Sequence, residues 1–264
     1  PFTLSMEEAQ SLINQKETNA YGIQPEYKQL INPDTITHKF WCGNWRYTQH
    51  RHLTAAYMSD KSCMMSWAYT NDLFNEFSLF SLPQWKNSNP QLYKDIAAGN
   101  ELLKQTVPLT LDISFNATDC HSENTPYIDE EHLDFCPSVV TLPTDFYKKC
   151  FCAVVTESEY FRPTGSLSEK TINAIKAGRP FILVSSPTSI EFLHKLGFKT
   201  FNDFWDESYD QETDHEQRFI KVLNLIKELD NKPLSELQYM YRSMTEILEH
   251  NFDNLYKLRI YDKY

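Results

Sequence analysis

Residues 151–186, FCAVVTESEYFRPTGSLSEKTINAIKAGRPFILVSS, carry the clearest pattern of secondary structure in the chain. This stretch opens with a continuous apolar run of strand length at 151–157 and closes with a second buried strand at 179–186. Between the two runs, SEKTINAIKAG has the length and spacing of a short helix, and Gly178 is its expected C-terminal glycine. Strand, helix and strand in such short order predict an α/β fold with a parallel sheet and helices on its faces.

The pattern continues on both sides of this stretch. Downstream, SPTSIEFLHKLG predicts a helix ending at Gly197, FKTF (198–201) a brief third strand, and HEQRFIKVLNLIKELD (215–230) a helix. A last helix of about 25 residues is expected to open with Ser235 and Gln238 as a capping box. Upstream, we expect a strand at 36–42, a helix from about Thr48, a short strand in CMMSWAY (63–69) and a helix after Pro90.

Composition limits the class of protein. Hydrophobic residues make up 41% of the 264 and aromatic residues 14%, which is enough for a sizeable packed core. No apolar run reaches the roughly 18 residues of a membrane span, and no signal-peptide pattern opens the chain. A soluble, cytoplasmic protein is therefore expected, in the host cytoplasm if the chain is viral. A net charge of −11 repels duplex nucleic acid, which is not an expected partner.

Six cysteines are scattered without the paired spacing of a zinc site. They are Cys42, Cys63, Cys120, Cys136, Cys150 and Cys152. A metal site is the alternative, because His121 follows Cys120 and His132 could share a helical face with Cys136. We expect free, buried thiols, which suit a reducing cytoplasm.

The junctions between strand and helix carry the candidate site. In a parallel sheet, ligands bind outside the carboxyl ends of the strands, near helix N-termini that favour anions. Glu157 lies at such a strand end, and Ser168, Glu169 and Lys170 lie at the following helix start. The lysine can pair with a diphosphate, and the adjacent carboxylate can accept hydrogen bonds from ribose hydroxyls. The alternative is structural: an ordinary N-cap, a first-turn glutamate and an exposed lysine.

These residues resemble the C-terminal, donor-binding half of the fucosyltransferase-like GT-B glycosyltransferases. The matching positions are Glu157-Ser158, Ser168-Glu169-Lys170, Asn173-Ala174, Ala177-Gly178 and Pro180. The resemblance implies a ribose contact for Glu169, a phosphate contact for Lys170 and a Glu157 that shapes the donor pocket. It covers residues 156–183 only. It departs from the family at Ser158, where asparagine is usual, and after Gly178, where one residue fewer precedes the proline.

The resemblance also implies a GT-B-like fold of two Rossmann-like domains. An N-terminal acceptor-side domain would span 1–145, a C-terminal nucleotide-sugar-binding domain 146–234, and a helix over 235–264 would brace them. Residues 193–210, LHKLGFKTFNDFWDESYD, are similar to a segment of uncharacterised, often virus-encoded, glycosyltransferase-like proteins. Asp206, Glu207 and Asp210 suggest a metal site, but acidic loops are more often solvated and GT-B enzymes generally need no such metal. No metal ligand is therefore predicted.

Basic side chains cluster in the first half, where GNWRYTQHRH (43–52) brings together Arg46, His50, Arg51 and His52. This segment is similar to an N-x-R-x-x-x-H-R pattern in the same relatives. The predicted helix would present His50 and Arg51 in its first turn, where arginine suits phosphate and histidine could be a general base or a hydrogen-bond donor. A surface patch that offsets nearby acids is the alternative. Other candidate bases are Asp112, Asp119 and Glu123.

Together these features predict a glycosyltransferase that moves a sugar from a nucleotide-sugar to a glycan or other hydroxyl acceptor, without a tightly bound cofactor. Its predicted catalytic residues are His50 and Arg51, and its donor-binding residues are Arg46, Glu157, Ser168, Glu169 and Lys170. One alternative is a non-catalytic nucleotide-sugar-binding or assembly protein that keeps the fold. Another is a different nucleotide-using enzyme on a doubly wound sheet, although the chain has no G-x-G-x-x-G or P-loop motif.

Overall fold

The computed structural model describes residues 28, 30–44, 47–67, 80–106, 144–163, 165 and 167–258. Four strands of this part of the chain form one sheet in the order β2-β1-β3-β4, and every neighbouring pair is parallel. The strands are β1 (His38–Gly43), β2 (Cys63–Ser66), β3 (Cys150–Thr156) and β4 (Phe181–Val184). The predicted α/β fold with a parallel sheet is confirmed.

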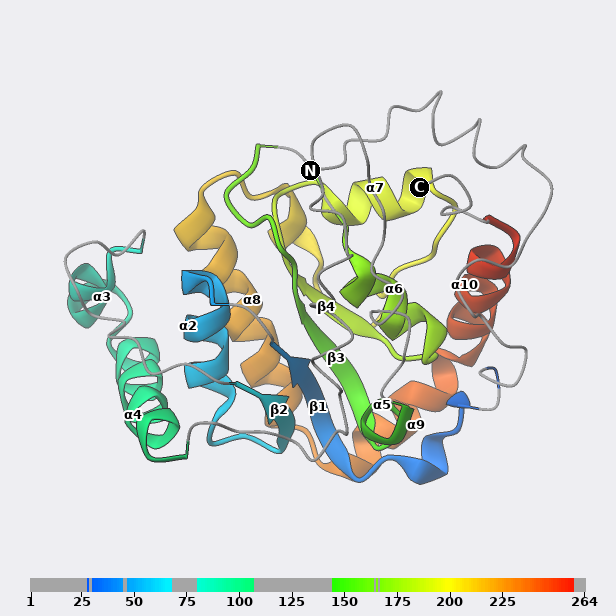
Figure 1. Ribbon diagram of the computed structural model, residues 1–264, viewed down its shortest axis with the longest axis horizontal. Coiled ribbons are helices and arrows are strands. Elements are labelled where there is room, and N and C mark those ends of the chain that lie inside the picture. Colours follow the sequence, from blue (N-terminus) through cyan, green and yellow to red (C-terminus); the bar gives the residue numbers. More distant parts are fainter. Residues whose placement is uncertain are drawn as a thin grey trace, which may run out of the picture.

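The winding of the sheet reverses between β1 and β3, its two central strands. From β1 the chain passes through α2 (Gln49–Met58) and moves outward to β2. From β3 it passes through α6 (Glu169–Lys176) and moves outward to β4 on the other side. Helices α2 and α6 cover opposite faces of the sheet (Figure 1). In open α/β sheets of this kind, ligands bind at the carboxyl edge where the strand order reverses.

Further helices complete the two outer layers (Figure 1). Helix α8 lies on the α2 face against β4, and α4 packs on the outside of α2 with α3 beside it. Helices α9 and α5 lie against the sheet on the α6 face, and α10 packs against α6. Their bounds are α3 Leu82–Ser88, α4 Pro90–Thr106, α5 Thr144–Tyr147, α7 Ser189–Lys195, α8 His215–Asp230, α9 Leu234–Ser243 and α10 Thr245–Leu258, with short 3-10 turns at Pro33–Thr35 and Ser208–Gln211.

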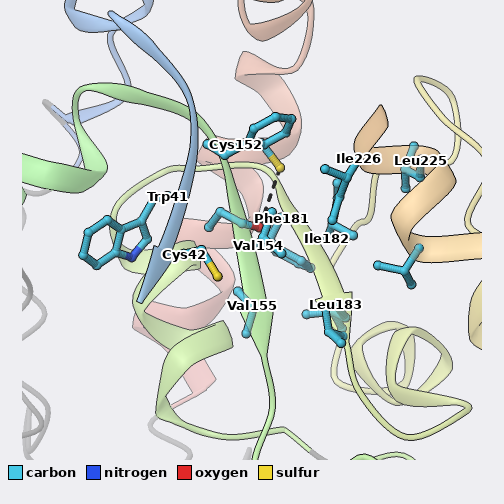
Figure 2. Close-up of a cluster of buried hydrophobic side chains, with 14 of the residues drawn as sticks. Trp41, Cys42, Cys152, Val154, Val155, Phe181, Ile182, Leu183, Leu225 and Ile226 are labelled. Atoms are coloured by element: carbon cyan, nitrogen blue, oxygen red, sulfur yellow. Dashed lines mark hydrogen bonds between the residues drawn. The ribbon is translucent and has the colours of Figure 1, made fainter. Parts of the chain in front are cut away.

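Coverage on both faces explains why β3 and β4 lack an alternating pattern of buried and exposed residues. All seven residues of β3 and all four of β4 are buried, as expected for parallel strands between two helical layers. Figure 2 shows this core, with Ile182 of β4 directed toward α8, where Leu225 and Ile226 lie. Asp214 is the N-cap of helix α8, and its carboxylate accepts the backbone N–H groups of Glu216 and Gln217 in the first turn. The apolar residues of this helix recur at a spacing of three to four and are buried, at Phe219, Val222, Leu223, Ile226 and Leu229.

Four of the six cysteines lie in the described strands and are free. Cys42, Cys150 and Cys152 are buried, and Cys63 is partly buried. Burial raises the pKa of Cys42 to about 12, so the thiol stays protonated and unreactive at neutral pH. The prediction of free thiols is thus confirmed for these four. Cys120 and Cys136, with their neighbours His121 and His132, lie outside the described residues.

Three predictions about the C-terminal half are wrong. FKTF (198–201) is not a strand, because the side-chain amide of Asn251 accepts the N–H of Lys199 at 2.8 Å and donates to its carbonyl at 2.7 Å. Those groups therefore need no partner strand. The last helix is two helices, since the chain breaks at Met244 and so lets α9 pack on β1 and β3 while α10 packs on α6. Gln238 is not a cap residue, because its amide donates to the Ile36 carbonyl at 3.0 Å.

The predicted segments 1–145 and 146–234 each supply two strands to this one sheet. Separate sheets for two GT-B domains are therefore not confirmed in the described residues. Helix α9, within the predicted brace, contacts β1 from the first segment and β3 from the second. None of the helices described is long and apolar enough to cross a membrane.

Candidate functional site

Predicted site residues from both halves of the chain meet at the carboxyl end of β3. Helix α2 follows Thr48 as predicted. Its first turn contacts the carboxyl end of β3, where the winding of the sheet reverses; we call this place the switch point. His50 Nε2 donates to the main-chain carbonyl of Glu157 at 2.9 Å. The guanidinium of Arg51 lies 3.3 Å from the carbonyl oxygen of Thr156 and 3.3 Å from the Ser158 hydroxyl. Both side chains are buried, so their positions are set by packing against β3.

Glu157 fastens the start of α6 to the end of β3. Its side chain is 1% exposed, and one carboxylate oxygen accepts the backbone N–H of Ser168 at 3.0 Å and the hydroxyl of Thr171 at 2.5 Å. Hydrogen bonds to a carboxylate are stronger than those between neutral groups. The buried side chain of Glu157 therefore positions the start of α6 relative to the end of β3.

Lys170 places an ammonium group over the same junction. The Ser168 hydroxyl accepts the backbone N–H of Lys170 at 3.3 Å, which makes it the N-cap of α6. The Lys170 Nζ lies 3.3 Å from that hydroxyl and 3.5 Å from the hydroxyl of Ser158. Ser158 is thus approached by Lys170 from α6 and by Arg51 from α2. Two cations far apart in sequence converge on one hydroxyl at the switch point.

Two other predicted donor-binding side chains are not described. Glu169 is the first residue of α6, but its side chain lies outside the described part of the structure. Arg46 lies wholly outside it, as do the candidate bases Asp112, Asp119 and Glu123. Their predicted roles stay predictions.

The pKa of His50 is low, and the positive charges of the site contribute to lowering it. The pKa of His50 is lowered from 6.5 to about 3, chiefly by burial; the bond to the Glu157 carbonyl opposes the shift, and the charges of Arg51, Lys170 and Arg218 add to it. The ring is therefore neutral at pH 7. Since a carbonyl only accepts, Nε2 carries the proton. This pKa argues against the general-base role considered for His50 and favours the role of hydrogen-bond donor.

Arg218 is a component that the sequence analysis missed. It lies in the first turn of α8, is 2% exposed and donates to the carbonyls of Ser185, Glu212 and Tyr160 at 2.8–3.0 Å. Its guanidinium also lies 4.6 Å from the centre of the Tyr160 ring. Arg218 precedes Val222 by four residues, so both lie on the apolar face of the helix. The burial of Arg218 could have been predicted from this spacing.

A second missed component links the carboxyl ends of three strands. The Thr156 hydroxyl, at the end of β3, donates to the side-chain oxygen of Asn44 at 2.5 Å. Asn44 follows β1, and its backbone N–H donates to the hydroxyl of Ser66 on β2 at 3.0 Å. These hydrogen bonds link the ends of β1, β2 and β3 and do not involve Arg51 or Lys170.

The acidic segment WDESYD supports the fold. Asp210 accepts the backbone N–H groups of Ile190 and Glu191 and so caps α7. Glu207 accepts from the Thr200 hydroxyl and the Phe201 N–H, while Asp206 accepts from Ser208. Burial raises the pKa values of Glu207 and Asp210. A cavity of about 350 Å³ is lined by this segment and α7, and no predicted site residue lines it. No group of three potential metal ligands occurs among the described residues.

No protein-family model, curated protein or solved structure matches this chain. The resemblance of residues 156–183 to glycosyltransferases therefore stays a prediction.

Proposed function

We propose that this protein is a nucleotide-sugar-dependent glycosyltransferase whose donor diphosphate binds beside the end of β3. The observation that carries the proposal is the convergence of Arg51 and Lys170 on Ser158, where the winding of the sheet reverses. The chain has a net charge of −11, so a local cluster of cations at this edge is a specific feature. Such a cluster suits a diphosphate, which arginine and lysine bind through charge-assisted hydrogen bonds.

The proposed reaction is a displacement at the anomeric carbon of the donor sugar. The oxygen of an acceptor hydroxyl forms a bond to that carbon, and the bond from the carbon to the β-phosphate oxygen breaks. The electron pair leaves with the nucleoside diphosphate, whose added negative charge Lys170 and Arg51 stabilise. The hydroxyl proton passes to a base, for which the sequence offers Asp112, Asp119 and Glu123. His50 is a positioning residue that ties α2 to β3.

Other parts of the proposal follow from the same site. Glu169, at the first position of α6, is proposed to accept hydrogen bonds from the ribose. The chain's own cations supply the charge at the leaving group, so the proposal assigns no tightly bound cofactor or metal. The acceptor is a glycan or another hydroxyl compound. A second GT-B domain belongs to the proposal, but the donor site does not require one, since α2 and α6 flank a single sheet. Free cysteines support a reducing cytoplasm.

Replacing Lys170 by Met tests the donor site, because the substitution removes the charge and keeps the apolar stem. Opposite charges 4 Å apart near a protein surface attract by about 4 kcal/mol before solvent screening. Lys170 is only partly buried, so we expect roughly 1–2 kcal/mol, or about tenfold weaker binding. Isothermal titration with UDP, GDP, ADP, CDP and inorganic pyrophosphate measures the loss.

The matched control is Lys227→Met, which removes an exposed lysine of α8 far along the helix from its N-terminal turn. Binding by this variant should equal that of the wild type. The proposed donor site is wrong if Lys170→Met binds every diphosphate as the wild type does, or if the wild type binds none.

A non-catalytic nucleotide-sugar-binding protein is the second candidate. The low pKa of His50 favours this candidate. The histidine that was predicted to be catalytic is a very weak base and donates a hydrogen bond to a main-chain carbonyl. Incubation with UDP-, GDP-, ADP- and CDP-sugars separates the two candidates. A transferase releases the nucleoside diphosphate slowly by hydrolysis, and that release should fall in the Lys170→Met variant. Binding without any release would favour the second candidate.

A further inference from the structure

A large exposed aromatic side chain lies beside the cationic cluster. Phe161 is 43% exposed, whereas its neighbour Tyr160 is 1% exposed. It follows Ser158, the hydroxyl approached by both Arg51 and Lys170, by three positions. The ring also lies 6.3 Å from the ring of His50, which anchors α2 at the same edge. An apolar ring left in solvent at a charged site calls for a ligand that has both an anionic and an apolar part.

The loop that carries Phe161 leaves the end of β3 (Figure 1) and is hydrogen-bonded to the rest of the fold just before the ring. Before the ring, the Glu159 carbonyl accepts the backbone N–H of Ser186 at 3.1 Å, and the Tyr160 carbonyl accepts from Arg218 at 2.9 Å. The Tyr160 hydroxyl donates to the His215 carbonyl at 2.6 Å. Phe161 therefore extends from a fixed backbone, and a ligand that meets it does not have to order the loop.

Four aromatic rings contact Phe161, each at a large angle to its plane. Its contacts with Tyr160 and His215 have centroid distances of 5.1 and 5.4 Å and interplanar angles of 85° and 66°. Those with Phe80 and His50 have angles of 60° and 79°. None of these four rings is therefore stacked parallel to Phe161, and 43% of the residue stays exposed. A planar ligand can stack on the face of such a ring, which is the geometry that aromatic side chains offer to nucleobases.

The distance from the cations also fits a nucleotide. Three residues of extended chain span at most about 10 Å, so the backbone of Phe161 lies within that reach of Ser158. That limit is short enough for one nucleotide to reach both the cations and the ring. A diphosphate held by Arg51 and Lys170 can therefore place its base against Phe161.

We infer that Phe161 is the stacking surface for the nucleobase of the donor. The inference rests on the proposed function and assigns the apolar end of the donor to a residue outside the matched motif positions. Stacking on one phenyl face uses no base-specific hydrogen bond, so Phe161 contributes affinity for any base. Base selectivity, if measured, comes from other groups.

Removal of the ring tests this inference. Base stacking contributes affinity that corresponds to about five- to hundredfold weaker binding when the aromatic side chain is lost. Phe161→Ala should therefore bind UDP, GDP, ADP and CDP more weakly by that factor while binding inorganic pyrophosphate as the wild type does. Phe161→Leu, which keeps apolar packing against Tyr160 and Phe80, should show most of the same loss. Phe161→Tyr should retain nucleotide affinity.

Tyr239→Ala is the control, since Tyr239 is 69% exposed on α9 and should leave every affinity unchanged. Equal binding of the nucleotides by Phe161→Ala and wild type, with Lys170→Met still weakened, overturns the stacking role and keeps the donor site. An equal loss of pyrophosphate and nucleotide affinity in Phe161→Ala shows local disruption and also overturns it. Absence of any binding by the wild type overturns both the donor site and this inference.

Discussion

The neutral state of buried His50 has a measurable effect on stability. Its pKa lies near 3 in the folded protein, lowered from 6.5 chiefly by burial. In the unfolded chain the ring titrates near its ordinary value of about 6.5. Between these two values the unfolded state binds a proton that the folded state does not. The free energy of unfolding therefore falls as the pH is lowered through 6.5, and the contribution is fully present only above that value.

The size of the effect follows from the two pKa values. Each pH unit between them changes the free energy of unfolding by about 1.4 kcal/mol. Lowering the pH from 7 to 5 should therefore reduce the free energy of unfolding by roughly 2 kcal/mol through protonation of His50 in the unfolded chain. That is a large part of the 5–15 kcal/mol typical of a folded domain.

Urea unfolding of the wild type and of His50→Gln at pH 7 and pH 5 isolates this contribution. The glutamine amide can still donate to the Glu157 carbonyl but does not titrate. Other titrating groups are common to both proteins, so they cancel in the difference between the two pH dependences. The wild type should lose roughly 2 kcal/mol more than the variant on acidification. Equal losses would mean that His50 titrates normally, and the general-base role would then regain support.

Two further predictions concern the fold around the site. Thr171→Val should lower the free energy of unfolding by roughly 2 kcal/mol, because the buried Glu157 carboxylate loses a donor, whereas Thr171→Ser should stay close to wild type in urea unfolding. A valine variant as stable as wild type would contradict that hydrogen bond. Gly178→Ala should cost more than Gly197→Ala by thermal unfolding. Both glycines have positive φ, worth about 1–2 kcal/mol of strain, but only at Gly178 would the new Cβ lie 2.3 Å from Ile31. Equal losses would rule out the clash.

Most of the local elements could be predicted from the sequence. The runs at 151–157 and 179–186 indicated β3 and β4, and the helix between them ends at Gly178, whose φ of 58° requires the freedom of glycine. The start of α2 after Thr48 was also predicted. Such features depend on residues close in the chain, namely side-chain period, caps and glycines, so a single sequence is enough to indicate them.

The errors arose where a distant residue satisfies the backbone. FKTF has the composition of a strand, but Asn251 of α10 bonds both backbone groups of Lys199. The tail has a continuous helical pattern, but packing against two different layers breaks it at Met244. Neither partner can be read from the local pattern.

The candidate site was likewise predictable in part, where its features depend on neighbouring residues and not on the fold. Ser168 and Lys170 could be placed at a helix start from the sequence, because they follow the local rules for a helix N-terminus. That Arg51, over a hundred positions before Lys170, reaches the same Ser158 hydroxyl became visible in the three-dimensional fold. The reason is the pairing of β1 with β3, which places the two helix starts on either side of one strand end. Strand order depends on long-range contacts, and these have no signature in the spacing of neighbouring residues.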